Sequence, residues 1–339
     1  MRIRTIARAT ALAIAVWLPG NAMNAPNATY TNPVYAHDFP DPFILTVGGV
    51  FYAYATETRG YGFQVMQSPD LVHWTHKGTI FRPPWSSVHL WAPEVLHYRG
   101  RFYMTYSAKN PSTGKREIGV AVADSPLGPF TDKAILARPA QNNPLGVIDA
   151  TLFVDADGAP YMLYSEEEPR RIVLRRLAPD LMSAVTDPEP VVQPDRPWEF
   201  GVTEAPTLIR RNGRYHLFFS VGGFQSDNKA GAVYAVAHAV ADRITGPYKK
   251  DDAPLLHTVP GRVYSPGHQC IVRLPSGEDW IAYHAWDAQN EPHYGSNPLG
   301  RTLRIDRLIW RGDAPYVDGP STEPRPAPDV RPRPRDRAR

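Results

Sequence analysis

Residues 91–107 read WAPEVLHYRGRFYMTYS, and this stretch decides the fold. A short apolar segment leads into a turn at Gly100, and an aromatic-rich segment follows, which is the pattern of a β-hairpin. The same form returns four more times at intervals of 51 to 64 residues, with turn glycines Gly49, Gly158, Gly213 and Gly277. Repeats of this length built from short strands indicate propeller blades. Five copies therefore predict an all-β, five-bladed β-propeller.

The segments between the hairpins support this prediction. Most hairpins are followed by a third apolar segment and then by a proline-containing turn, such as Ser68-Pro69-Asp70 or Ser125-Pro126-Leu127. No long apolar pattern with a period of 3.6 residues occurs, so helices are expected to be few. An immunoglobulin-like sandwich would also be all-β, but it does not require a repeating hairpin.

The two ends of the chain differ from the repeats. Arg2, Arg4 and Arg8 precede the apolar run 11–18, and small residues follow it, which predicts a signal peptide over residues 1–25 and a secreted or periplasmic protein. The alternative is a disordered end. The propeller is expected to span residues 32–320. Residues 321–339 are rich in Pro and Arg and nearly free of large apolar side chains, which predicts a disordered tail.

Composition excludes several classes of partner and site. The net charge is only +3, and no basic stripe indicates nucleic acid. The N-terminal apolar run is too short to span a bilayer, so no membrane contact is expected. Cys270 is the single cysteine, which excludes an internal disulfide and a cysteine-built metal site.

Chemically useful residues recur at one position of the repeat. Nine residues before each turn glycine stand Pro40, which Asp41 follows, Trp91, Asp149, Glu204 and His268. The innermost strands of a propeller line its central channel, so these side chains are expected to ring the channel mouth. Each has an ordinary interpretation: a turn former, a strand cap, a solvated loop residue or a structural histidine. Their coincidence in one register favours a binding site.

Three carboxylates in one channel suit glycoside hydrolysis. That reaction needs a protonated acid for the leaving oxygen and an ionised carboxylate for water or for direct attack. A third carboxylate beside the acid would raise the pKa of the acid, since two close negative charges resist ionising together. No cofactor is required. The chain holds neither His-Glu-x-x-His nor Gly-x-Ser-x-Gly, which excludes a zinc protease and a serine hydrolase of those types.

Several motifs, taken in order, resemble family 43 of the glycoside hydrolases. They are Pro40-Asp41-Pro42, Trp91-Ala92-Pro93-Glu94, Ile148-Asp149, Thr203-Glu204-Ala205-Pro206, Pro266-Gly267-His268 and Gly300-Arg301. The resemblance covers nearly the whole chain from about residue 32 to 320 and implies a five-bladed propeller. It also implies that Asp41 is the general base, Glu204 the general acid and Asp149 the residue that tunes the acid, with inversion at the anomeric carbon. Asp38 is the alternative base.

The resemblance extends to the substrate-binding residues. Arg301 resembles the channel arginine of the family. His268 resembles the channel histidine that holds a hydrated calcium or sodium ion in arabinanase-like members, so such an ion is expected only from the resemblance. Trp91 is a candidate stacking wall for the sugar, with plain channel packing as the alternative. Glu166–Glu168 are expected to form a loop, at most near the channel rim.

The expected substrate is an arabinose- or xylose-containing polysaccharide or oligosaccharide. Residues 280–287 and 300–310 resemble the arabinanase and α-L-arabinofuranosidase branch, which favours arabinose. Trp198, in the segment 188–200, favours cleavage at chain ends if it blocks the channel. A β-xylosidase of the same family, a non-catalytic carbohydrate-binding propeller and a related sucrose- or fructan-active enzyme are the alternatives. The carboxylates argue against the second, and the opening Phe39-Pro40-Asp41-Pro42 against the third.

Overall fold

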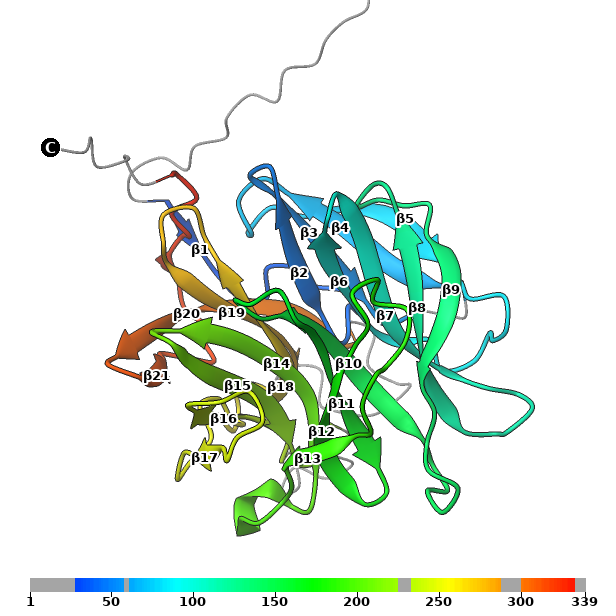
Figure 1. Cartoon of the computed structure of the whole chain (residues 1–339). Coiled ribbons are helices and arrows are strands. Elements are labelled where there is room, and N and C mark those ends of the chain that lie inside the picture. Colours follow the sequence, from blue (N-terminus) through cyan, green and yellow to red (C-terminus); the bar gives the residue numbers. More distant parts are fainter. Residues whose placement is uncertain (1–27, 58–60, 225–232, 288–299, 333–339) are drawn as a thin grey trace, which may run out of the picture.

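The computed structural model describes residues 28–57, 61–224, 233–287 and 300–332. These residues form five four-stranded antiparallel sheets, and within each sheet the strands follow one another in chain order. The predicted five-bladed β-propeller is confirmed. Figure 1 follows the chain from the blue strands of blade 1 to the orange strands of blade 5.

The strands of each blade are as follows. Blade 1 contains β2 (Phe43–Val47), β3 (Val50–Ala55), β4 (Phe63–Ser68) and β5 (Thr75–Phe81). Blade 2 contains β6 (Trp91–Tyr98), β7 (Arg101–Lys109), β8 (Arg116–Ala123) and β9 (Thr131–Ala137). Blade 3 contains β10 (Val147–Val154), β11 (Pro160–Glu167), β12 (Arg170–Arg176) and β13 (Glu189–Val192). Blade 4 contains β14 (Thr203–Arg211), β15 (Arg214–Val221), β16 (Ala235–Ala241) and β17 (Lys249–Lys250). Blade 5 contains β18 (Val263–Arg273), β19 (Asp279–Asp287), β20 (Thr302–Arg311) and β21 (Ala314–Val317). The one helix among the described residues is a 3₁₀ turn at Pro197–Glu199.

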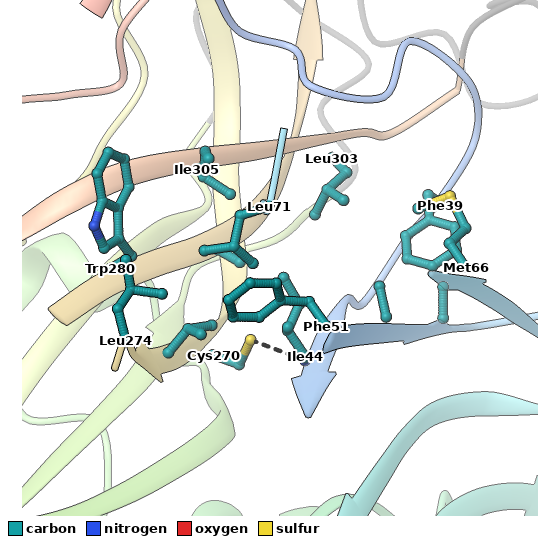
Figure 2. Close-up of a cluster of buried hydrophobic side chains, with 14 of the residues drawn as sticks. Phe39, Ile44, Phe51, Met66, Leu71, Cys270, Leu274, Trp280, Leu303 and Ile305 are labelled. Carbon is teal, nitrogen blue, oxygen red and sulfur yellow. Dashed lines mark hydrogen bonds between the residues drawn. The ribbon is translucent and has the colours of Figure 1, made fainter. Parts of the chain in front are cut away.

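The innermost strands close into a ring. β2, β6, β10, β14 and β18 contact one another in succession, and β18 contacts β2 to complete the circle. A hydrophobic cluster fills each of the five gaps between neighbouring blades. Figure 2 shows the cluster that joins blade 5 to blade 1, where Ile44 and Phe51 pack with Trp280 and Ile305. In the same cluster, the Ile44 N–H donates to Cys270 Sγ at 3.3 Å.

The inner strands share an unusual backbone conformation at the channel mouth. One residue at the mouth of each blade adopts a left-handed conformation, with φ between 48° and 58° at Asp41, Ala92, Asp149, Ala205 and His268. β-Bulges interrupt the pairing at these positions in blades 2 to 5. A bulge re-aims a side chain and is frequent beside active sites. The bulges therefore explain how strand residues point into the channel mouth.

A repeating hydrogen bond holds these bulges. The N–H of Ala92 donates to Thr56 Oγ1 at 2.8 Å, and the N–H of Asp149 donates to Ser107 Oγ at 3.0 Å. Ser220 Oγ accepts from the His268 N–H, and His284 Nδ1 accepts from the Asp41 N–H. Each acceptor lies at the end of the second strand of the preceding blade. Neighbouring blades are thus linked by one buried bond at the mouth.

The left-handed positions correct the alignment of the five repeats that was based on their turn glycines. Asp149 and His268 occupy the left-handed position, whereas Trp91 and Glu204 stand one residue before it. The hairpin turns differ in length between blades. Counting nine residues back from the turn glycine therefore reaches the left-handed position in some blades and the residue before it in others. Both positions still face the same channel mouth.

The C-terminal segment differs from the predicted disordered tail. β22 (Arg325–Pro326) pairs with β1 (Thr29–Tyr30), and Ser321 is buried. Ala327 and Val330 pack on the cluster between blades 5 and 1. Backbone pairing and a few small apolar contacts order this segment despite its polar composition. The predicted signal peptide lies outside the described residues, and none of the helical structure described is long and apolar enough to cross a membrane.

Candidate active site

All six predicted site residues line one cavity at the channel mouth. Its volume is about 370 Å³, and its walls include Asp41, Trp91, Asp149, Glu204, His268 and Arg301. These side chains come from all five blades, so the ring closure of the propeller brings them together. The remaining lining residues are Ile148, Glu167, Arg170, Val202, Gly222, Gly223, Phe224 and Tyr234.

Asp41 is a buried carboxylate with strong partners. Its Oδ1 accepts from Arg301 Nη1 at 3.0 Å, and its Oδ2 accepts from Thr56 Oγ1 at 2.5 Å. Burial alone would raise the pKa of Asp41, but the Arg301 charge, the neighbouring imidazoles and the Thr56 bond outweigh it and hold that pKa well below its usual range. Asp41 is therefore ionised at neutral pH and can accept a proton.

The alternative base, Asp38, does not line the cavity. Its Oδ1 accepts the Arg301 N–H at 2.9 Å, and it lies so close to Gly300 that a Cβ there would collide with the carboxylate. Asp38 thus supports Arg301 from outside the cavity. The Arg301 guanidinium also lies over the Phe224 ring, 4.7 Å from its centroid.

Glu204 has the opposite electrostatic character. Its side chain is half-buried in the cavity wall, and Tyr234 donates its hydroxyl to Oε1 at 2.7 Å. Burial raises the pKa of Glu204 to about 7, even though the Tyr234 bond and the Arg170 charge lower it. Glu204 therefore keeps a proton at a pH where an exposed glutamate has lost it.

Asp149 is linked to Glu204 through the backbone. Its Oδ2 accepts the N–H of Ala205 at 3.1 Å, which replaces the hydroxyl cap used at three other blade pairs. Burial and then the Glu204 charge raise the pKa of Asp149 well above its usual range. Two interacting carboxyls titrate as a pair, so the protons belong to the pair. The arrangement can hold a proton beside the cavity near neutral pH.

Trp91 forms a braced wall of the cavity. Its ring stacks on His89 with centroids 4.4 Å apart, and the Arg116 guanidinium lies 5.2 Å from the ring centroid. Arg116 in turn donates to Glu167, from Nε to Oε2 at 2.5 Å and from Nη2 to Oε1 at 2.6 Å. This network fixes the ring and leaves it beside the cavity, where an aromatic face can contact a sugar.

The segment Glu166–Glu168 is not simply a loop. Glu166 and Glu167 belong to β11, whose pairing with β12 continues to Glu167 and Arg170. Both side chains are buried because each pairs with an arginine, Arg171 for Glu166 and Arg116 for Glu167. In the sequence alone, three consecutive glutamates indicate a solvated turn. The arginines that pair with them lie on other strands and are not visible in the local pattern.

Trp198 does not close the cavity. It packs against the hydrophobic cluster between blades 3 and 4 and is absent from the cavity walls among the described residues. The argument for cleavage at chain ends that used Trp198 therefore fails.

His268 lies in the cavity with its Nδ1 3.3 Å from Asp41 Oδ1. Burial lowers the pKa of His268 despite the nearby Asp41 charge, which favours the neutral imidazole. Within the described parts of the chain, no three His, Cys, Asp or Glu side chains come together as a metal site. Ca²⁺ takes about six to eight oxygen ligands, so direct coordination by protein does not fit. A hydrated ion needs only the one imidazole nitrogen.

The sequence pattern did not single out Thr56, Arg116, Glu167, Arg170 and Tyr234. These residues lie outside the inner-strand register, and their importance follows from contacts between strands or blades. A hydroxyl at the end of the second strand in four of the five blades was the available signal: Thr56, Ser107, Ser165 and Ser220 occupy matching places.

Comparison of the sequence with known proteins identifies the family to which it is similar. Residues 30–315 match the family model Glycosyl hydrolases family 43. The chain is 27% identical over 291 residues to the extracellular endo-α-(1→5)-L-arabinanase 1 of Bacillus subtilis, across 81% of this chain and 86% of the relative. It is 30% identical over 285 residues to a β-D-galactofuranosidase of Aspergillus niger, across 78% of both. A β-xylosidase of Bacillus subtilis is 28% identical over 324 residues, which is 85% of this chain and 57% of the relative.

Solved structures agree with the fold. A thermostable family-43 glycoside hydrolase superposes with a TM-score of 0.78 and 32% identity, across 88% of this chain and 99% of that one. An exo-1,5-α-L-arabinanase from a bovine ruminal metagenomic library superposes with a TM-score of 0.66 at 23% identity, across 83% and 97%, and supports the fold alone.

Proposed function

This chain belongs to family 43 of the glycosyl hydrolases, and from that premise we propose that it is an inverting glycosidase that cleaves α-L-arabinofuranosyl linkages in plant polysaccharide or oligosaccharide. The observation that carries the proposal is a pair of carboxyls with opposite surroundings in one cavity: Arg301 and Thr56 hold Asp41 ionised, and Glu204, whose pKa is raised to about 7, keeps its proton to near neutral pH. Separating the pKa values of two titratable groups is how one site supplies both a base and an acid.

The proposed reaction uses these two groups directly. Asp41 removes a proton from a water molecule, whose oxygen attacks the anomeric carbon. The bond from that carbon to the leaving oxygen breaks, and its electron pair stays with the leaving oxygen. Glu204 gives its proton to that oxygen. Asp149 holds the backbone next to Glu204 and tunes the acid electrostatically, and Arg301 and Trp91 contact the sugar.

The furanose preference rests on the relatives. The arabinanase and the galactofuranosidase both act, by their names, on five-membered sugar rings. β-D-Galactofuranose has the ring stereochemistry of α-L-arabinofuranose and a longer substituent at C4, so β-D-galactofuranosides are a second candidate substrate. A β-xylosidase remains the alternative because such relatives match with similar identity.

A substrate screen tests this proposal. Nitrophenyl α-L-arabinofuranoside, β-D-galactofuranoside and β-D-xyloside are offered separately, and linear 1,5-arabinan is offered as polymer. We expect the arabinofuranoside and arabinan to be cleaved and Glu204→Gln to lose about 10²- to 10⁴-fold in rate on arabinan. Activity confined to the xyloside would overturn the arabinose assignment. On arabinan, early free arabinose indicates cleavage at chain ends, and mixed oligomers indicate internal cleavage.

The stereochemical outcome tests the role of Asp41. An inverting enzyme leaves room for water between carboxyls about 6.5–9.5 Å apart. Proton NMR of the first-formed sugar should therefore show the inverted anomer. A retained anomer would make Asp41 a nucleophile.

Two further properties belong to the proposal. A hydrated calcium or sodium ion is proposed beside His268, and elemental analysis with a chelator control tests it: activity unchanged by the chelator and no bound metal would leave an ordinary hydrogen-bonded imidazole. Secretion is proposed from residues 1–25 and from extracellular relatives such as the arabinanase of Bacillus subtilis. N-terminal sequencing of the exported protein tests the cleavage site.

A further inference from the structure

Tyr234 is a fully buried tyrosine that touches the proposed acid. It stands one residue before β16 in blade 4, and its hydroxyl donates to Glu204 Oε1 at 2.7 Å. The ring stacks on His284 with centroids 5.7 Å apart and planes 10° apart. His284 in turn accepts the Asp41 N–H. Tyr234 therefore contacts both Glu204, the proposed acid, and His284, which bonds the backbone of Asp41, the proposed base.

Gly267 makes room for this ring. A Cβ at Gly267 would overlap two carbons of the Tyr234 ring, which is an impossible contact. The backbone of Gly267 is not left-handed, so the close approach of Tyr234 and not the backbone conformation requires glycine here. Together, Gly267 and His284 confine the ring, and the hydroxyl has a fixed position relative to Glu204.

We propose that Tyr234 is a positioning residue for the acid: by donating to Oε1 of Glu204 it directs the transferable proton to Oε2 and stabilises the carboxylate that remains after transfer. This inference rests on the proposed function of Glu204. In the step, the Oε2–H bond breaks and the proton passes to the leaving oxygen. Tyr234 keeps its own proton throughout.

The surroundings agree with a permanent donor. Burial and then the Glu204 charge raise the pKa of Tyr234 well above its usual range, so the phenol stays protonated. The charged groups that act on the pKa of Glu204 are the cation Arg170 and the carboxylates Asp41 and Glu167, and the Glu204 charge in turn raises the pKa of Asp149. Among the groups acting on Glu204, Tyr234 is the neutral donor that lowers its pKa. Removing the hydroxyl should therefore raise the pKa of Glu204 and weaken it as an acid.

Tyr234→Phe tests this with a series of aryl and alkyl α-L-arabinofuranosides of graded leaving-group basicity. For poor leaving groups, we expect kcat to fall about 10- to 100-fold, part of the 10²- to 10⁴-fold that general acid catalysis supplies. For dinitrophenyl leaving groups, which need no proton, kcat should change little. The alkaline limb of the pH profile should move to higher pH. An equal loss for every leaving group, with an unmoved limb, would reduce Tyr234 to a packing residue.

Tyr54→Phe is the matched control. Tyr54 is equally buried, and its hydroxyl donates to the Pro126 carbonyl at 2.8 Å, outside the cavity. This variant should keep the wild-type leaving-group dependence. Gly267→Ala is a second probe, because it displaces the Tyr234 ring while keeping the hydroxyl. It should reproduce the same dependence on leaving group, and a melting curve checks that it folds.

Infrared titration of the Glu204 carboxyl band gives a readout that needs no activity, with Glu204→Gln used to assign the band. The band should titrate at higher pH in Tyr234→Phe than in the wild type. If the wild type cleaves none of the glycosides but the titration still shifts, the proposed function fails and the coupling of Tyr234 to Glu204 stands. If the wild type is active and the titration and leaving-group dependence do not change, only this inference fails.

Discussion

At the scale of single residues, the neighbours of Asp41 and Glu204 shift the pKa values of these two carboxyls in opposite directions. Asp41 meets a guanidinium and a hydroxyl, whereas Glu204 meets a phenol and a second buried carboxyl. Both lose solvent, but among the described residues only Asp41 has a cation at ion-pair distance, Arg301 at 3.0 Å. The charged partners, and not burial, therefore decide which carboxyl is ionised.

This difference predicts the pH dependence of kcat/KM. Activity needs Glu204 protonated, and its pKa is raised to about 7, so activity should fall as pH rises through that value. Asp41 must be ionised, and because its pKa is lowered, activity should persist to well below the usual titration of an aspartate. Asp149 and Glu204 titrate as a pair, and the second ionisation of the pair is opposed by the charge left by the first. In Asp149→Asn a single carboxyl remains, so the alkaline limb should move to lower pH.

The pH profiles of the wild type and Asp149→Asn provide the measurement. A limb in Asp149→Asn that stays in place or moves to higher pH would contradict the coupling of these two carboxyls. Tyr234→Phe should move the same limb in the opposite direction, so the two variants check each other.

At the scale of elements, a bond between blades holds each bulge at the mouth. The hydroxyl at the end of the second strand caps a left-handed N–H of the next blade in three blade pairs, and His284 does so for Asp41. Between blades 3 and 4 the carboxylate of Asp149 takes this bond, and the buried Ser165 Oγ has no partner among the described residues. The site is thus built by replacing one structural cap with a carboxylate.

Ser107→Ala should destabilise the fold, because it leaves the buried N–H of Asp149 without an acceptor. An unsatisfied buried donor costs about 1–3 kcal/mol. Ser165→Ala is the matched control: the same atom is removed from the equivalent place in blade 3, where it has no partner among the described residues, and the effect should be within about 0.5 kcal/mol. Urea unfolding of the two variants measures the difference, and equal destabilisation would argue against the capping bonds.

At the scale of the whole molecule, blade 5 and blade 1 are joined without sharing a sheet. Each blade is built from consecutive strands, so no strand pairing joins blade 5 to blade 1. Closure of the ring therefore relies on side-chain packing and on contacts made by the first and last described segments. Tyr30 donates its hydroxyl to the Ile305 carbonyl, and Asn32 bonds Ile305 and Ser321. The C-terminal segment completes this seam through β22.

A chain that ends at Pro320 should therefore be less stable than one that ends at Pro332. The shorter chain loses β22 and the Ser321 N–H that donates to the buried Asp306 Oδ2 at 3.1 Å. Several hydrogen bonds worth about 0.5–1.5 kcal/mol each suggest a loss of about 2–4 kcal/mol. The chain ending at Pro332 keeps every contact named here and serves as the control. Equal unfolding midpoints in urea would show that the C-terminal segment does not contribute to closure.

Local sequence patterns predict the repeating unit and the inner-strand side chains at the cavity, whereas Arg301 was expected only from the resemblance to the family. Both follow from local patterns, since turn glycines and apolar alternation define hairpins, and Asp41, Asp149 and Glu204 stand near the start of the same inner strand in their blades. The neighbours that those carboxyls meet could not be predicted from local patterns, because they come from distant parts of the chain. Arg301 reaches Asp41 from blade 5, and Thr56 and Tyr234 reach their carboxyls from other strands of the same blade, so these contacts depend on ring closure and on strand pairing. The order of the C-terminal segment was decided in the same way, because its partners lie at the opposite end of the chain.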